Sequence, residues 1–438
     1  MEISPQRRTE ILDALRRGTV PGQGLDALAV GLDRFAPTFD EELDRVASGA
    51  GVFKAIRGEY GAGKTFITRW LAERAKARGL ATSEVQISET DTPMHRYQTI
   101  YRRLVEQLST ATVRTGGLRT VIDSWFFALE DEVLAAGDID QNDATSLMHR
   151  TTELMEQRLS GVTRTAPAFS AVLRAYLAAT NAGDRPTADG LLAWLGGQPH
   201  VAASVKRSAG IKGDLDHDAA LSFLAGLLTI LRDAGFGGLV LVLDEVETMQ
   251  RMRSDTRDKG LEALRKFIDD LYEGRFPGLY LVITGTPAFF DGSQGVQRLT
   301  PLAQRMHTDF GDPRFDNPRA VQVRLQGFDL DALVAVGARV RDLFAAGATD
   351  PDRILARCDD EYLATLARAV TGELGAKVGV APRLYVKKLV GEVLDRLELF
   401  ADFDPRVDYK LTVTDTELTV VERNARHATS PDDIELDL

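Results

Sequence analysis

The sequence predicts an α/β protein with a parallel five-stranded sheet, a large helical insertion and a C-terminal helical lid. Predicted strands and helices alternate along most of the chain, which is typical of a parallel sheet with right-handed crossovers. A glycine-rich loop at residues 58–65 lies between a predicted strand and a predicted helix. The apolar segment 239–243 ends in Asp244 and Glu245. Residues 108–216 hold helical patterns and are too long for a simple loop, which indicates an inserted helical region.

Apolar patterning justifies each element in turn. Ser4 and Pro5 suit the start of the first helix, and Gly18 suits its end. Short apolar segments bounded by turn residues predict strands at residues 51–57, 81–88, 239–243, 279–284 and 321–325. Apolar residues at helical spacing predict helices at residues 3–17, 40–48, 66–77, 93–107, 219–233, 258–273, 330–345, 359–369 and 382–400.

These elements divide the chain into five regions. The aromatic residues of the insertion fall on helical patterns, so we expect them in a core rather than on a base-stacking surface. The alternating segment 410–421 predicts a hairpin. The regions are an N-terminal segment with the first part of the core (1–107), the insertion (108–216), the second part of the core (217–327), the lid (328–400) and a tail (401–438).

Composition restricts the function classes. The formal net charge of −12 opposes a wholly basic nucleic-acid-binding surface, because neutralising phosphates supplies most non-specific affinity. The single cysteine, Cys358, excludes an internal disulfide and a cysteine-cluster zinc site. No apolar run approaches the length of about 18 residues that a membrane span needs, and residues 1–17 do not form a secretory signal. We expect a cytoplasmic protein without a membrane segment.

The loop sequence Gly-Glu-Tyr-Gly-Ala-Gly-Lys-Thr matches the pattern G-x-x-x-x-G-K-[ST] of loops that bind nucleoside triphosphates. Its glycines let backbone N–H groups point at phosphate oxygens, and the following helix adds its positive dipole end. Lys64 is expected beside the β- and γ-phosphates, and Thr65 at a Mg²⁺ ion. A merely flexible loop is the alternative, which the strand–loop–helix context disfavours. The predicted ATP-binding residues of the loop are Gly58, Tyr60, Gly61, Ala62, Gly63, Lys64, Thr65 and Phe66.

The acidic pair is the second motif with a chemical meaning. Ligands of open α/β sheets bind at the carboxyl ends of the strands, where both the loop and the pair are expected. Asp244 would help to hold Mg²⁺, and Glu245 would orient and polarise the attacking water. The alternative is an acidic pair that caps the next helix. Because both carboxylates are present, the pair favours a hydrolysing enzyme.

Threonines and arginines supply the remaining candidates. Thr284 ends a predicted strand where a hydroxyl would contact the γ-phosphate or the water. Thr286 is the second choice, and a turn-stabilising threonine is the alternative. Charge on the transferred phosphoryl group calls for an arginine, and Arg305 is the first candidate within residues 298–319. Arg383 opens a late helix, from which a lid would reach the phosphates. A surface arginine is the alternative for each.

Together these features resemble the AAA+ ATPases, in the branch close to replication-origin recognition proteins, over residues 19–400 without the insertion. Within that branch, residues 4–21, 58–65 and 85–97 are similar to the ATPases of BREX phage-defence systems, the BrxC/BrxD group, and most closely to its BrxD members. The resemblance implies an ATPase that acts beside a methyltransferase, a phosphatase-like protein and a helicase to restrict phage DNA.

The resemblance also implies residue roles. Thr284 matches the first sensor position and Arg383 the second, while Val20 and Pro21 fall where such ATPases contact adenine. Origin-recognition relatives carry a winged helix after the lid. The tail after residue 400 is too short for one, so we do not expect DNA binding through such a domain unless the insertion replaces it.

The leading hypothesis is therefore a Mg²⁺-dependent ATPase whose hydrolysis drives or gates a nucleoprotein defence assembly. We expect a homo-oligomer or a complex with the other BREX proteins, and DNA stays open as a partner. One alternative is a nucleotide-gated scaffold that hydrolyses ATP too slowly to do work. Another is a DNA-bound initiator or regulator similar to origin-recognition ATPases.

Overall fold

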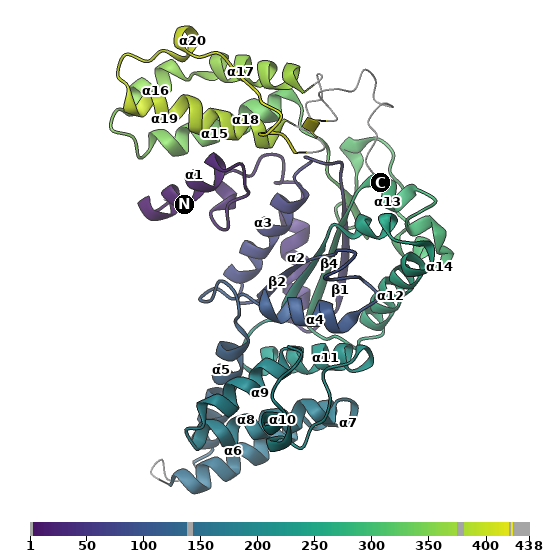
Figure 1. Ribbon diagram of the computed structural model, residues 1–438. Helices are drawn as coiled ribbons and strands as arrows, with labels where there is room; N and C mark the ends of the chain where they lie inside the picture. The colour runs from purple at the N-terminus through teal and green to yellow at the C-terminus, as the bar shows by residue number, and fades with distance from the viewer. Residues whose placement is uncertain (1–2, 138–142, 375–380, 420–421, 424–438) are drawn as a thin grey trace.

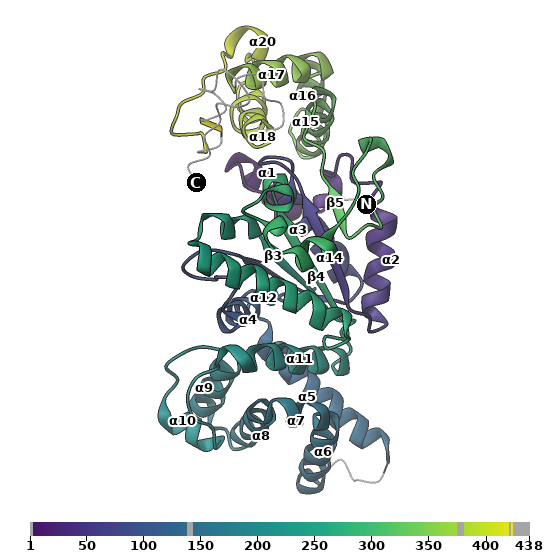
Figure 2. The ribbon, with the colours of Figure 1, turned by 90° about the vertical axis from the view of Figure 1, so that its right-hand side faces the viewer.

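The computed structural model describes residues 3–137, 143–374, 381–419 and 422–423. The molecule is elongated, with three regions in a row (Figure 1). The C-terminal lid lies at one end, the sheet with its covering helices lies in the middle, and the helical insertion lies at the other end. The view turned by 90° shows the same order (Figure 2).

The central sheet has five strands in the described part of the chain, and every neighbouring pair is parallel. The strand order is β2-β3-β4-β1-β5, which confirms the predicted parallel sheet. Every residue of β1, β3 and β4 is buried, which explains why β3 and β4 are nearly continuous apolar runs. Strand β1 also buries two charged residues, Lys54 and Arg57. The strands are β1 (Val52–Arg57), β2 (Ala81–Gln86), β3 (Leu239–Asp244), β4 (Leu279–Gly285) and β5 (Gln322–Arg324).

Two hydrophobic clusters cover the two faces of the sheet, because successive strand residues point to opposite sides. Val240 and Val242 face the cluster that includes Phe39 and Trp70, which lie on the helices before and after β1. Leu241 faces the other cluster, which extends into the insertion. The core helices are α2 (Ala36–Ala47), α3 (Lys64–Ala77), α4 (Tyr97–Glu106), α11 (His217–Asp233), α12 (Ser254–Tyr272), α13 (Pro287–Asp291) and α14 (Thr300–Met306), with 3₁₀ turns η1 (Leu25–Ala27), η2 (Val246–Arg251), η3 (Val296–Arg298) and η4 (Pro313–Phe315).

The insertion is helical, as its sequence predicts. Trp125, Phe169 and Trp194 are buried, so these aromatic residues belong to a core. Phe169 and Trp194 make edge contacts with Phe223 of α11, which joins the insertion to the sheet. Phe127 is the exception, because 65% of it is exposed. The helices are α5 (Leu118–Ala135), α6 (Ala144–Arg158), α7 (Ser160–Thr165), α8 (Pro167–Asn181), α9 (Arg185–Leu195) and α10 (Ala203–Ser208).

The lid has its own hydrophobic cluster, separate from the two at the sheet. The N-terminal helix α1 (Pro5–Arg16) packs into this cluster through Ile11 and Leu15. Arg16 also forms two 2.7 Å hydrogen bonds to Asp395. Helix α1 therefore packs with the lid, although it belongs to the predicted region 1–107, an N-terminal segment with the first part of the core. The lid elements are α15 (Leu330–Ala345), α16 (Pro351–Arg357), α17 (Asp360–Glu373), α18 (Pro382–Lys388), the π-helical turn η6 (Leu389–Leu394) and α19 (Asp395–Leu399).

The tail does not form the predicted hairpin within its described residues. It contains the short helix α20 (Pro405–Asp408) and then coil and turn over residues 410–419. Residues 420–421, the rest of the predicted hairpin, lie outside the described residues. Side chains of this coil pack against the lid instead, including the buried Leu418. The alternating pattern thus reflects contact with a helical surface rather than strand pairing.

Candidate functional site

The glycine-rich loop joins β1 to α3 at the carboxyl edge of the sheet. Gly61 and Gly63 have φ values of +82° and +90°, a left-handed conformation that glycine adopts without steric cost. Gly63 is the N-cap of α3, so the unpaired N–H groups of the first helical turn lie beside the loop. The backbone has the form of an anion-binding cradle.

Lys64 folds back over this loop and is only 9% exposed. Its Nζ donates hydrogen bonds to the carbonyl oxygens of Gly58 at 2.8 Å and Glu59 at 3.4 Å. The carboxylate of Glu247 is 3.9 Å away, and the centre of the Tyr60 ring is 5.0 Å away. The ammonium group is thus held by the loop itself, and a phosphate would have to replace these acceptors.

The acidic pair lies at the end of β3, next to the ends of β2 and β4. The hydroxyl of Thr284 and the backbone N–H of Glu245 both donate to Oδ1 of Asp244, the latter at 3.1 Å. Glu245 has a left-handed φ of +59°, which is uncommon for a residue with a side chain. Its Oε2 accepts a 2.7 Å hydrogen bond from Nε2 of Gln86, at the end of β2. Neighbouring strands therefore fix both carboxylates.

Glu247 is a third carboxylate at this edge. It is 5% exposed, and its two oxygens have no hydrogen-bond partner within the described chain. Burial raises the pKa of this carboxyl to about 7, although the nearby Lys64 lowers it. Burial and then the charge of Glu247 raise the pKa of the Tyr60 hydroxyl. The edge of the sheet thus holds a carboxyl group that changes charge near neutral pH.

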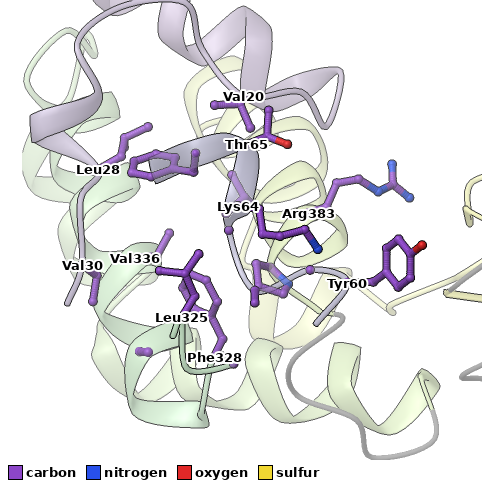
Figure 3. Close-up of a pocket in the computed structure, with 18 of the residues that line it drawn as sticks. Val20, Leu28, Val30, Tyr60, Lys64, Thr65, Leu325, Phe328, Val336 and Arg383 are labelled. Atoms are coloured by element: carbon purple, nitrogen blue, oxygen red, sulfur yellow. The ribbon is translucent and has the colours of Figure 1, made fainter. Parts of the chain in front are cut away.

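A cavity of about 750 Å³ lies between this edge and the lid, a size within the usual range of ligand sites. Figure 3 shows Lys64, Tyr60 and Arg383 at one side of it and Leu28, Val30, Leu325 and Phe328 at the other. One end is therefore polar, with Lys64 and Arg383 beside the carboxylates of the sheet edge, and the other end is apolar. This arrangement suits a molecule that has phosphate groups at one end and a flat base at the other.

Most of the predicted site residues line this one cavity. Residues from the loop, the acidic pair, the N-terminal segment and the lid all contribute to its wall. Gly58 and Thr284 do not line it, and Thr284 acts behind it as the partner of Asp244. The predicted residues that line the cavity are Val20, Pro21, Tyr60, Gly61, Ala62, Gly63, Lys64, Thr65, Phe66, Asp244, Glu245 and Arg383.

The two predicted arginines have different surroundings. Arg305 lies on α14 outside the lining of the cavity, and its Nη2 donates to Asp269 at 3.1 Å. It therefore does not line the cavity of its own chain. Arg383 does line the cavity, but its guanidinium is paired with Glu422 of the tail.

Thr65 and Asp244 offer oxygen ligands of the kind that Mg²⁺ prefers. Both hydrogen bonds to Asp244 described above use Oδ1, so neither occupies its Oδ2. No group of three or more His, Cys, Asp or Glu residues arranged for a metal occurs among the described residues. A few protein oxygens fit Mg²⁺, which takes most of its ligands from phosphates and water.

Sequence reasoning missed Gln86, Glu247 and the apolar wall that the lid supplies. Gln86 pairs in register with Asp244, so only the strand order shows that it reaches Glu245. The position of Glu247, three residues after Asp244, was a weak signal for a third acidic residue at this edge. Phe328 precedes a predicted lid helix and carried no sign of a contact with the loop.

The fold and the cavity are those of a nucleotide-binding α/β protein. A family model described as BREX system ATP-binding protein BrxC/D matches residues 3–413. The chain therefore belongs to the BrxC/BrxD family of ATP-binding proteins of BREX phage-defence systems. No curated protein matches it significantly. Among the described residues, no helix is both long and apolar enough to span a membrane.

Proposed function

We propose that the protein is a Mg²⁺-dependent AAA+ ATPase of the BrxD type that couples its nucleotide state to a DNA-associated defence complex. One observation carries the proposal: the loop residues Lys64 and Thr65 line the same cavity as Asp244 and Glu245, which are far away in the sequence. An anion cradle that faces two carboxylates is the arrangement needed for phosphoryl transfer to water.

Each residue has a role that its geometry supports. Lys64 would exchange its carbonyl acceptors for phosphate oxygens and neutralise their charge. Glu245 would orient the attacking water after its carboxylate has released the hydrogen bond from Gln86. The hydroxyl of Thr284 keeps Asp244 in place. Mg²⁺ bound by Thr65 and Asp244 would neutralise charge that develops on the phosphates. The apolar end, with Val20 and Pro21, would bind the base.

The family and the architecture support the finer assignment. The parallel sheet followed by a helical lid agrees with the AAA+ resemblance. Residues 4–21 and 85–97 carry the similarity to BrxD members. As partners we propose further copies of this chain or the methyltransferase, helicase and phosphatase-like proteins of the system. The net charge of −12 disfavours broad direct contact with DNA, so we propose that such partners supply much of the contact with DNA.

The hydrogen bond between Gln86 and Glu245 also favours the scaffold alternative. While it persists, the carboxylate that would act on water is engaged, so hydrolysis would be slow until a partner moves it. The ATPase and scaffold hypotheses predict different effects of Glu245→Gln on turnover and assembly. Nucleotide-dependent assembly that is identical in wild type and Glu245→Gln, together with negligible wild-type turnover, would support the scaffold.

The proposal is tested with Lys64→Ala and Glu245→Gln. We expect Lys64→Ala to bind ATP at least tenfold more weakly, since it loses a charge-assisted contact with the phosphates. Glu245→Gln should bind ATP normally but lose at least about a hundredfold in turnover. Binding is measured by calorimetry and turnover by phosphate release, with and without Mg²⁺. Wild-type binding and turnover no higher than those of Lys64→Ala would refute the proposal.

A further inference from the structure

The tail returns from the lid to the nucleotide cavity. Thr419 and Glu422 line its wall together with the loop and the acidic pair. Glu422 is only 2% exposed, although carboxylates are rarely so deeply buried without a partner. The proposed function assigns no role to this carboxylate, which lies beside the nucleotide cavity.

The charged partner of Glu422 is Arg383, the arginine of the lid that faces the cavity, and Oε2 of Glu422 also accepts a 2.7 Å hydrogen bond from the backbone N–H of Thr419. Nε of Arg383 donates to Oε1 of Glu422 at 2.9 Å, and Nη2 donates to Oε2. Nη2 also donates to the backbone carbonyl oxygen of Glu417 at 2.6 Å. This paired edge of the guanidinium is the one that matches a carboxylate or a phosphate in shape and charge.

The opposite edge of the guanidinium is also confined. A methyl group in place of a hydrogen of Gly18 would lie 3.1 Å from Nη1 of Arg383, because the end of α1 approaches so closely. Gly18 has a φ of +70°, and the absence of a side chain leaves this narrow space open. Arg383 therefore lies between the end of α1 and the tail, and its phosphate-binding edge faces the tail.

Further ion pairs hold the tail against α18, the lid helix that contains Arg383. Both carboxylate oxygens of Glu417 accept 3.0 Å hydrogen bonds from Nζ of Lys388, which is 2% exposed. Lys387 lies 3.6 Å from the same carboxylate. The buried Leu418 packs into the lid cluster beside these pairs. The tail thus has a fixed place on α18, from which Glu422 meets Arg383.

We infer that Glu422 is an intramolecular competitor of the nucleotide phosphates for Arg383, so that the tail weakens nucleotide binding until a triphosphate displaces it. The inference rests on the proposed function of the same cavity. Glu422 and a phosphate group are both anionic and both fit the paired edge of one guanidinium. A ligand that binds better to the form with a free Arg383 shifts the protein towards that form.

The test measures the dissociation constant of ATPγS in a double-mutant cycle of Glu422→Gln and Arg383→Ala. In the full chain, Glu422→Gln should bind ATPγS about five- to tenfold more tightly, a coupling typical of two sites in one protein. In the Arg383→Ala background, Glu422→Gln should change nothing, because the contested group is absent. A structural role for Glu422 would affect both backgrounds equally.

A second variant and a control distinguish an effect on nucleotide binding from an effect of unfolding. Glu417→Gln weakens the fastening of the tail without altering the side chain that meets Arg383, and should tighten binding to a smaller extent. Glu398→Gln is the control, because Glu398 accepts from Thr349 elsewhere in the lid and does not line the cavity. Thermal melting of each variant confirms that it is folded.

Displacement of the tail by the nucleotide can also be measured directly. ATPγS should speed tryptic cleavage after the exposed Lys410 in wild type but not in Arg383→Ala. If wild type binds ATPγS and Glu422→Gln binds it equally or more weakly, the inference is overturned and the proposed function stands. If wild type and all variants fail to bind ATPγS, the proposed function itself fails.

Discussion

Glu247 is a carboxylate whose buried environment brings its pKa close to neutral pH. Its folded pKa of about 7 lies above the ordinary value of 4.5, so the folded state holds this proton more tightly than the unfolded state. Its contribution to stability is thus fully present below about pH 4.5 and is lost as the pH rises to about 7. The loss is on the order of 3 kcal/mol, at 1.36 kcal/mol per pKa unit.

We predict that Glu247→Gln becomes more stable relative to wild type as the pH rises through this window, because the amide cannot ionise. Urea unfolding of the nucleotide-free protein at several values between pH 5 and pH 8 measures the difference. The exposed Glu89→Gln serves as the matched control and should differ from wild type by less than about 0.5 kcal/mol throughout. A difference between Glu247→Gln and wild type that is constant with pH would contradict the prediction.

At the scale of elements, the lid depends on close contact between α15 and α18, which both line the cavity. A methyl group added at Gly337 of α15 would lie 2.1 Å from the hydroxyl oxygen of Tyr385 on α18. Gly337→Ala should therefore separate the two helices and cost about 1–3 kcal/mol of unfolding free energy. It should also weaken nucleotide binding, since Ala332 and Arg383 would move apart.

The matched control is Gly372→Ala in α17. A methyl group there meets nothing within 4 Å, so the substitution should be neutral or should stabilise the helix by up to about 1 kcal/mol. Chemical denaturation measures both variants. Equal stability of the two variants would show that the lid tolerates a wider spacing between α15 and α18.

At the scale of the whole molecule, the arginines of residues 298–319 are the candidates for completing the site of a second copy. Arg305 is paired with Asp269, whereas Arg314 is 80% exposed and pairs with Asp312 two residues away. We propose that Arg305, or the less restrained Arg314, completes the site of a neighbouring copy. Mixing Arg314→Ala with Glu245→Gln should then restore turnover that neither variant shows alone.

The mixing experiment distinguishes the possible origins of the arginine. In a mixed oligomer, an intact site of the Arg314→Ala chain meets the intact arginine of the Glu245→Gln chain. The same mixture made with Arg305→Ala tests the first candidate. Full turnover of both arginine variants alone would exclude both residues, and loss of turnover without recovery on mixing would indicate a role within one chain.

Local patterns were sufficient for most of the fold and for the centre of the candidate site. Apolar runs predicted the strands, because buried parallel strands need no alternation, and the loop and acidic pair were readable because their spacing is local. The start of α2 was predicted at residue 40, four residues late. Pro37 lies within the first turn of the helix, where proline is tolerated, so the helix begins before this proline rather than after it. The hairpin was wrong over residues 410–419, since alternation fits any surface that is apolar on one side.

The sequence by itself determined the chemical groups: an anion cradle, two carboxylates at a strand end and a family match over nearly the whole chain. Only the tertiary structure decided which distant groups meet them. It brought Gln86 to Glu245, Glu422 to Arg383 and α1 to the lid. The physical reason is the separation of the interacting residues along the chain. Motifs record constraints between neighbours in the chain, whereas strand order and the packing of the tail depend on the total burial of segments that no local pattern connects.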